Sequence, residues 1–159
     1  PRPPSVPGHK SFASSHKGRQ PFETIDLNGI SQTLWPDHCV QGSFGAEFHS
    51  ELDTRCVEAI FRKGVDPEID SYSAFYDNQN LRSTGLAGFF REKGVTEVYG
   101  CGLAGDICVY YTLKDSLKCG FATTLIADAA RALDEKNYEA AQKDLVENKG
   151  RIVLSADIG

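Results

Sequence analysis

The alternation of strand-like and helix-like segments between residues 95 and 155 constrains the fold of this chain most. Three segments are typical of strands: VTEVYGCGLA, FATTLIADA and RIVLS. Between them lie two segments with apolar residues at helical spacing, DICVYYTLKDSLKCG and EKNYEAAQKDLVENKG. Short connections in a strand–helix–strand order favour parallel strands with right-handed crossovers. The sequence therefore predicts an α/β fold, a three-layer α/β/α sandwich with a mainly parallel sheet.

The first half of the chain is less regular. Residues 1–29 are rich in Pro, Ser, Gly and His and are predicted to be loop. An ordered loop leading into a short helical turn is predicted for LWPDHCVQGSFGAEFHSEL, and a strand for CVEAIFRKG. The segment VDPEIDSYSAFYDN is turn-rich, and TGLAGFFREKG is predicted to be a helix that ends at Lys93 and Gly94.

Composition narrows the class of protein. The 159 residues suit a single domain over 1–159. A net charge of −5 with scattered Lys and Arg argues against nucleic acid as a partner, and no apolar run is long enough to span a bilayer. Five cysteines at irregular spacings favour a reducing, cytoplasmic setting. The chain begins at Pro1 and contains no methionine, so we expect it to be part of a longer protein.

One cysteine has an unusual position. Cys108 follows a strand and lies in the first turn of the next helix, where ligands bind in parallel α/β sheets. A helix N-terminus favours the thiolate, and the small residues Gly102, Ala104 and Gly105 leave room for two N–H groups to form an oxyanion hole. A buried cysteine that only fills the core is the alternative. Position alone leaves both interpretations open.

Three blocks of the sequence resemble successive blocks of one family. LWPDHCVQGSFGAEFH, KGVDPEIDSYSAFYDN and VYGCGLAGDICVYYT are similar to nicotinamidases of the isochorismatase-like cysteine hydrolase superfamily, and the resemblance runs from Gly8 to the carboxyl end. It implies an isochorismatase-like hydrolase fold. It also implies an amidohydrolase that converts the small molecule nicotinamide to nicotinic acid and ammonia through a cysteine thioester, as in NAD salvage.

The resemblance also implies roles for individual residues. Cys108 matches the family nucleophile, and Lys63 matches the lysine that helps to deprotonate the thiol; alone, Lys63 would be taken as an exposed lysine at a strand end. The family's cis peptide would be Leu103–Ala104, which directs the Ala104 N–H with that of Cys108 towards the oxyanion.

A divalent metal ion, with zinc as the expected metal, is also implied by the family. His9 and His38 match two of its histidine ligands, although each histidine alone is more often a surface or core residue. Trp35, Tyr72 and Phe75 are candidates for an aromatic wall around the pyridine ring, with packing in the core as the alternative.

The remaining cysteines have no such role. Cys39 adjoins a metal histidine, Cys56 and Cys101 are expected in the core on strands, and Cys119 at a helix end.

Two family features are missing from the sequence. No block resembles the VDxQNDF segment that carries the general base, and Pro3 and Ser5 stand where the family has an aspartate and a histidine ligand. We therefore expect an isochorismatase-like domain that lacks its first strand and is nearly inactive as given. The alternatives are a catalytically silent binding protein of the same fold and an amidase for another small amide. A homo-oligomer stays open.

Overall fold

The computed structural model describes residues 8–158, so Pro3 and Ser5 lie outside the described residues. The chain divides into two compact units, Pro1–Ser71 and Tyr72–Gly159, which are described separately below. In the described range, no helix combines the length and apolar character that a membrane crossing requires.

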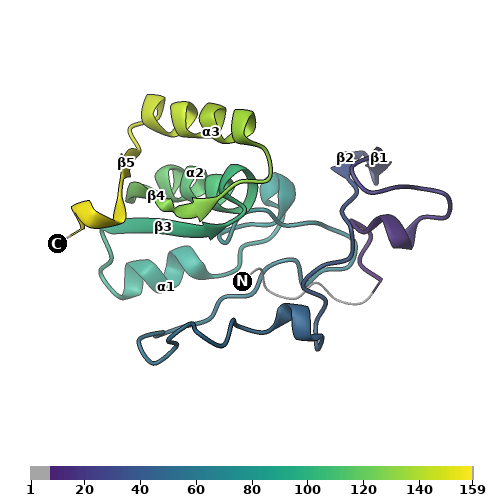
Figure 1. Ribbon diagram of the computed structural model, residues 1–159, viewed down its shortest axis with the longest axis horizontal. Helices are drawn as coiled ribbons and strands as arrows, with labels where there is room; N and C mark the ends of the chain where they lie inside the picture. The colour runs from purple at the N-terminus through teal and green to yellow at the C-terminus, as the bar shows by residue number, and fades with distance from the viewer. Residues whose placement is uncertain (1–7, 159) are drawn as a thin grey trace. The chain divides into compact units, whose positions relative to one another are not determined.

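The second unit contains a parallel sheet of three strands (Figure 1). These are β3 (Glu97–Leu103), β4 (Ala122–Arg131) and β5 (Arg151–Val153), in the order β3-β4-β5. β4 runs in register with β3 from Glu97↔Ala122 to Gly100↔Leu125, and a shift follows between Gly100 and Gly102. The sequence prediction of three parallel strands after Val95 is confirmed.

Helices cover both faces of this sheet. α1 (Leu86–Glu92) lies on one face, and α2 (Tyr110–Lys118) and α3 (Glu135–Glu147) lie on the other (Figure 1). The layers agree with the predicted α/β/α arrangement. α3 begins where the Asp134 carboxylate accepts the Asn137 N–H at 2.8 Å, the usual way to satisfy a helix N-terminus. Two 3₁₀ turns, η3 (Asn78–Asn80) and η5 (Ser155–Asp157), complete the unit.

The core of the second unit lies between the sheet and the pair α2 and α3. It is formed by buried side chains from the sheet, from both helices and from the residue before α2: Val109, Leu113, Leu125, Tyr138 and Leu145. Gly100 of β3 is part of this packing, because a Cβ there would lie 2.5 Å from Leu113 Cδ2. Helix and strand are therefore in closer contact than a larger residue at position 100 would allow.

The first unit contains a hairpin that the sequence prediction missed. β1 (Thr24–Leu27) pairs with β2 (Ile30–Thr33) in antiparallel register, although residues 1–29 were predicted to be loop. The turn residues Asn28 and Gly29 have φ of 56° and 82°, as a two-residue turn that matches strand twist requires. The 3₁₀ helices η1 (Ala13–Ser15) and η2 (Phe44–Ala46) also belong to this unit, and η2 confirms the short turn predicted there.

Two other predictions are wrong. The segment predicted as a strand over residues 56–64 is coil, and no strand pairs with it in the described chain. Cys56 is exposed in a turn and Ile60 is 56% exposed, so the segment has neither a backbone partner nor a buried face. Cys101 lies on β3 as predicted but is exposed, because it shares the exposed face of the strand with Tyr99 and Leu103.

Candidate active site

Cys108 lies in a π-helical turn that joins β3 directly to α2. This turn, η4 (Gly105–Val109), is closed by the N–H groups of Ile107 and Val109, which donate to the Ala104 carbonyl at 3.1 and 3.0 Å. The thiol-bearing residue is half-buried. The structure thus confirms the predicted position of Cys108 in the first helical turn beyond the strand, and π turns are frequent at functional sites.

The backbone around this turn depends on small residues. The Leu103–Ala104 peptide is cis, as the family resemblance implies, and Gly102 has a φ of 112° that favours glycine. A Cβ at Gly105 would lie 2.9 Å from Cε2 of Tyr138, a residue of α3. Gly105 therefore permits the turn to pack directly against the ring.

Asp106 anchors the same turn to the beginning of α3. Its carboxylate is buried and accepts the N–H groups of Leu133 at 2.9 Å and Asp134 at 3.1 Å. The sequence showed an acid two residues before Cys108 but not its role, because both partners lie 27 and 28 residues further along the chain.

Thr112 connects the Cys108 turn to Ala74 of the SYSAF segment, which is residues 71–75. Its hydroxyl donates to the Cys108 carbonyl oxygen at 2.6 Å and accepts the Ala74 N–H at 2.9 Å. One residue before Thr112, the Tyr111 ring lies with its centroid 5.5 Å from that of Tyr72. The sequence pattern alone did not identify Thr112, although its spacing of four from Cys108 on a helix was an available signal.

Phe75 occupies a core position. It is 1% exposed, and its ring centroid lies 6.0 Å from that of Phe90 and 6.2 Å from that of Phe121. Phe75 is therefore packed among other aromatic rings, which agrees with the second interpretation of this residue, as a side chain that fills the core.

Lys63, in the first unit, is buried rather than exposed at a strand end. Lys63 is 7% exposed, and its Nζ donates to the carbonyl oxygen of Ser71. Lysine is rarely buried to this extent without a partner, so this position differs from that of an ordinary surface lysine.

Asp70 organises the polar interior of the first unit. Its Oδ2 accepts from Trp35 Nε1 and from Gln32 Nε2, each at 3.1 Å, and its Oδ1 accepts the Ser71 N–H at 2.8 Å. The carboxylate is 1% exposed. It fixes the indole of Trp35 through the ring's polar edge, and sequence reasoning did not assign it this role because Trp35 is 35 residues away.

The two predicted metal ligands differ in their hydrogen bonding. The Pro36 carbonyl can only accept, so its 2.6 Å contact makes His38 Nδ1 the donor and Nε2 the unprotonated nitrogen, the form that binds metals. In His9 the roles of the two ring nitrogens are exchanged. Its Nδ1 accepts the Ser11 N–H at 3.1 Å, which leaves the proton of neutral His9 on Nε2. His38 therefore fits a metal, whereas His9 in this hydrogen-bonded state does not.

Within the part of the chain that the structure describes, the surroundings of these histidines do not complete a metal site. Both rings lie beside Phe12, with centroid separations of 5.8 Å for His9 and 5.6 Å for His38. Among residues 8–158, no group of three or more His, Cys, Asp or Glu side chains is arranged to hold an ion.

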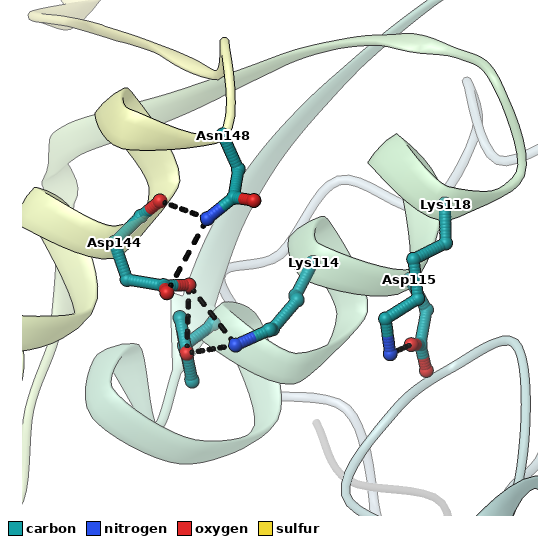
Figure 2. Close-up of polar contacts among 6 residues, drawn as sticks. Lys114, Asp115, Lys118, Asp144 and Asn148 are labelled. Atoms are coloured by element: carbon teal, nitrogen blue, oxygen red, sulfur yellow. Dashed lines mark hydrogen bonds and ion pairs between the residues drawn. The ribbon is translucent and has the colours of Figure 1, made fainter.

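A charged cluster joins α2 to α3 next to the Cys108 turn (Figure 2). Lys114 Nζ donates to the Tyr110 hydroxyl at 2.8 Å and lies 3.1 Å from Asp144 Oδ2, and the Tyr110 hydroxyl donates to the same oxygen at 2.9 Å. The hydrogen bonds from Tyr110 and then Lys114 lower the pKa of Asp144. The hydrogen bond to Tyr110 raises the pKa of Lys114, and burial raises that of Tyr110.

Comparison with known proteins identifies the family. The Isochorismatase domain family matches residues 18–157. A nicotinamidase of Acinetobacter baylyi is 49% identical over 126 residues, which are 79% of this chain and 59% of that relative. This chain belongs to the isochorismatase domain family, and within it the chain is similar to nicotinamidases. It spans about three fifths of the length of this curated relative.

Solved structures give the same result for the fold. A nicotinamidase pyrazinamidase of Acinetobacter baumanii, 42% identical, matches with a TM-score of 0.93 over 98% of this chain and 76% of its own. A pyrazinamidase of Pyrococcus horikoshii in complex with zinc, 31% identical, matches with a TM-score of 0.75 over 96% of this chain and 72% of its own. The predicted α/β class of the isochorismatase-like hydrolases is confirmed.

Proposed function

We propose that this chain carries the nucleophile of a nicotinamidase, which hydrolyses nicotinamide to nicotinic acid and ammonia in NAD salvage. The observation that carries the proposal is the position of Cys108 in a turn directly beyond a parallel strand. Hydrogen bonds of the Asp106 and Thr112 side chains hold this turn. Similarity to nicotinamidases supplies the substrate class.

The reaction follows from the roles proposed for three residues. The Cys108 thiolate attacks the carboxamide carbon, while the N–H groups of Ala104 and Cys108 stabilise the oxyanion. Lys63 assists proton transfer, and the amide C–N bond breaks as ammonia leaves. Water then adds to the thioester, which releases nicotinic acid and regenerates the thiol.

Two aromatic residues are proposed to contact the pyridine ring. The indole N–H of Trp35 donates to Asp70, which fixes the orientation of the ring, and Tyr72 is half-buried beside Tyr111. Phe75 is proposed to pack in the core against Phe90 and Phe121 instead of touching substrate.

The metal proposal is limited to one residue. The Pyrococcus horikoshii pyrazinamidase was solved with zinc, which supports a divalent ion in this family. We propose His38 as a ligand to such an ion, because its hydrogen bond to Pro36 favours the metal-binding form. No step of the reaction is assigned to the ion, since His9 does not fit a ligand as it is hydrogen-bonded.

We further propose that residues 1–159 form one isochorismatase domain, because the family match at 18–157 includes parts of both compact units. A cytoplasmic location is proposed because all five cysteines are thiols without a disulfide in the described chain.

The test is an assay for nicotinic acid and ammonia with the full natural polypeptide that carries this chain. We expect turnover of nicotinamide and its loss in Cys108→Ala, while Cys56→Ala, a change at an exposed cysteine, retains it. Hydrolysis of an aliphatic amide in preference to nicotinamide would favour another amidase. Binding of nicotinamide without turnover would favour the silent binding protein.

A further inference from the structure

We propose that Thr112 is a positioning residue that fixes the nucleophile turn and the Ser73–Phe75 segment relative to each other. The inference rests on the proposed amide hydrolysis. Thr112 lies on α2, four residues after Cys108, and 38 residues after Ala74 in the sequence. Its single hydroxyl contacts the backbone of both.

The two hydrogen bonds of Thr112 determine the direction of its hydroxyl proton. The Ala74 N–H can only donate, so the hydroxyl oxygen accepts from it at 2.9 Å. The Cys108 carbonyl can only accept, so the hydroxyl donates to it at 2.6 Å. One O–H thus satisfies two backbone groups from different segments, and a residue without a hydroxyl satisfies neither.

A second threonine holds the other side of the Ala74 residue. Thr84 Oγ1 donates to the Ala74 carbonyl at 2.6 Å, and the Thr84 N–H donates to the Phe75 carbonyl at 3.0 Å. Thr84 therefore fixes this segment without contacting Cys108, whereas Thr112 fixes it to the residue that carries the thiol.

The segment that Thr112 holds bears a residue proposed to contact substrate. Tyr72 lies two residues before Ala74, and its ring packs on Tyr111, the neighbour of Thr112. Thr112 does not touch the reacting atoms. It acts by keeping the Cys108 backbone in register with the segment that orients the pyridine ring, so the attack distance depends on it.

The experiment compares four variants in the full natural polypeptide. Thr112→Val keeps the side-chain shape and removes both hydrogen bonds, and Thr112→Ser keeps the hydroxyl. Thr84→Val loosens the same segment only from the other side. Ser116→Ala is the matched control, because it removes a buried hydroxyl pair with Thr123 from the same helix, at 2.8 Å, away from Cys108. Readouts are kcat and KM for nicotinamide, the alkylation rate of Cys108 by peptide mapping, and the unfolding midpoint.

We expect Thr112→Val to lower kcat/KM by about 10- to 100-fold, with kcat affected, because misplacement near 1 Å has costs of this size. The same variant slows alkylation of Cys108, since the backbone that positions its sulfur loses a hydrogen bond. Thr112→Ser restores both. Thr84→Val raises KM and leaves alkylation unchanged, and Ser116→Ala lowers only the unfolding midpoint.

The proposal is overturned if Thr112→Val alkylates and turns over at the parent rates, if Thr112→Ser behaves like Thr112→Val, or if Ser116→Ala reproduces the losses. Where Thr112→Val does not fold, Thr112→Ala is measured in its place against the same limits. If the parent protein hydrolyses no nicotinamide, the proposed function fails, and the alkylation rates still decide the role of Thr112.

Discussion

At the scale of single residues, the order in which the five thiols react tests whether the position of a cysteine or its solvent exposure determines its reactivity. Cys56 and Cys101 are exposed and Cys108 is half-buried, so accessibility alone predicts that the first two react first. We expect limited alkylation near neutral pH to label Cys108 ahead of Cys39, Cys56, Cys101 and Cys119, because Cys108 is the proposed nucleophile and lies in the first helical turn after β3. Lys63→Ala is expected to slow this labelling and to lower hydrolysis by about 10²- to 10⁴-fold, the usual contribution of proton transfer. Lys136→Ala, at an exposed lysine of α3, is the control. Labelling of Cys56 first, at the rate of an ordinary thiol, would contradict the role of Cys108.

Asp106 provides a second prediction at this scale. Asp106→Ala removes the acceptor of the part-buried hydrogen bonds from the Leu133 and Asp134 N–H groups, and the loss of each bond costs about 0.5–1.5 kcal/mol. We expect urea unfolding to show this loss, with Asp106→Asn intermediate because one amide oxygen still accepts. Glu92→Gln, at an exposed residue of α1, is the control and is expected to leave stability unchanged. An unchanged midpoint in Asp106→Ala would show that the two hydrogen bonds do not stabilise the turn.

Single residues also show where sequence reasoning reaches its limit. The thiol, the cis peptide and the glycines of the Cys108 turn lie within seven residues, so a local pattern identified them. Asp70 and Asp106 accept hydrogen bonds from Trp35 and Leu133, 35 and 27 residues away, which no local spacing encodes. Thr112 lies four residues after Cys108, but its second partner, Ala74, is 38 residues away.

At the scale of elements, the cluster between α2 and α3 predicts a pH dependence of stability. The folded-state pKa of Asp144 is lowered below its usual 3.8, so its contribution is present above that pH and is lost as the pH falls through the folded value. The pKa of Lys114 is raised above 10.5, so its contribution is lost only as the pH rises through a value above that.

We therefore expect Asp144→Asn to destabilise the protein by about 0.5–1 kcal/mol at pH 7, the range for a partly exposed ion pair. The difference from the parent narrows as the pH falls below 3.8 and disappears once the pH is below the lowered folded-state pKa of Asp144. Urea unfolding between pH 3 and 7 measures it. Glu147→Gln is the control, since its pair with Lys143 spans 3.8 Å on an exposed face. A difference that stays constant with pH would exclude the ionic contribution.

Elements with their own periodic pattern were predicted, and elements defined by a partner were not. β3, β4, β5 and the helices between them combine apolar periodicity with glycine ends, and each was found. The hairpin of β1 and β2 was missed although Asn28-Gly29 is a strong turn signal, because the strands beside it are only four residues long. The predicted strand at 56–64 had a suitable composition but no strand beside it to supply backbone hydrogen bonds.

At the scale of the whole molecule, the two units differ in how their backbones are stabilised. β4 is paired on both sides and contributes Leu125, 1% exposed, to a core shared with Leu113 and Leu145. In the first unit, residues 49–70 have no strand or helix, and Ile60 and Val65 are 56% and 55% exposed. Backbone amides that are hydrogen-bonded in a buried sheet exchange only through large openings, whereas amides in exposed coil exchange through local ones.

The rates of native-state amide hydrogen exchange are therefore expected to differ between the two units. The amides of β4 and of the inner turns of α2 and α3 exchange slowest, at a rate that follows global unfolding, and those of residues 49–60, which are exposed throughout, exchange fastest. The SYSAF segment is expected to lie between them, because Thr84 and Thr112 hold the Ala74 backbone through side chains rather than a ladder. Thr112→Val should speed exchange at Ala74 while leaving β4 unchanged. Equal protection across both units would mean that the described chain opens as one cooperative body. In that case, the hydrogen bonds of Thr112 would not stabilise the Cys108 turn separately from the rest of the chain.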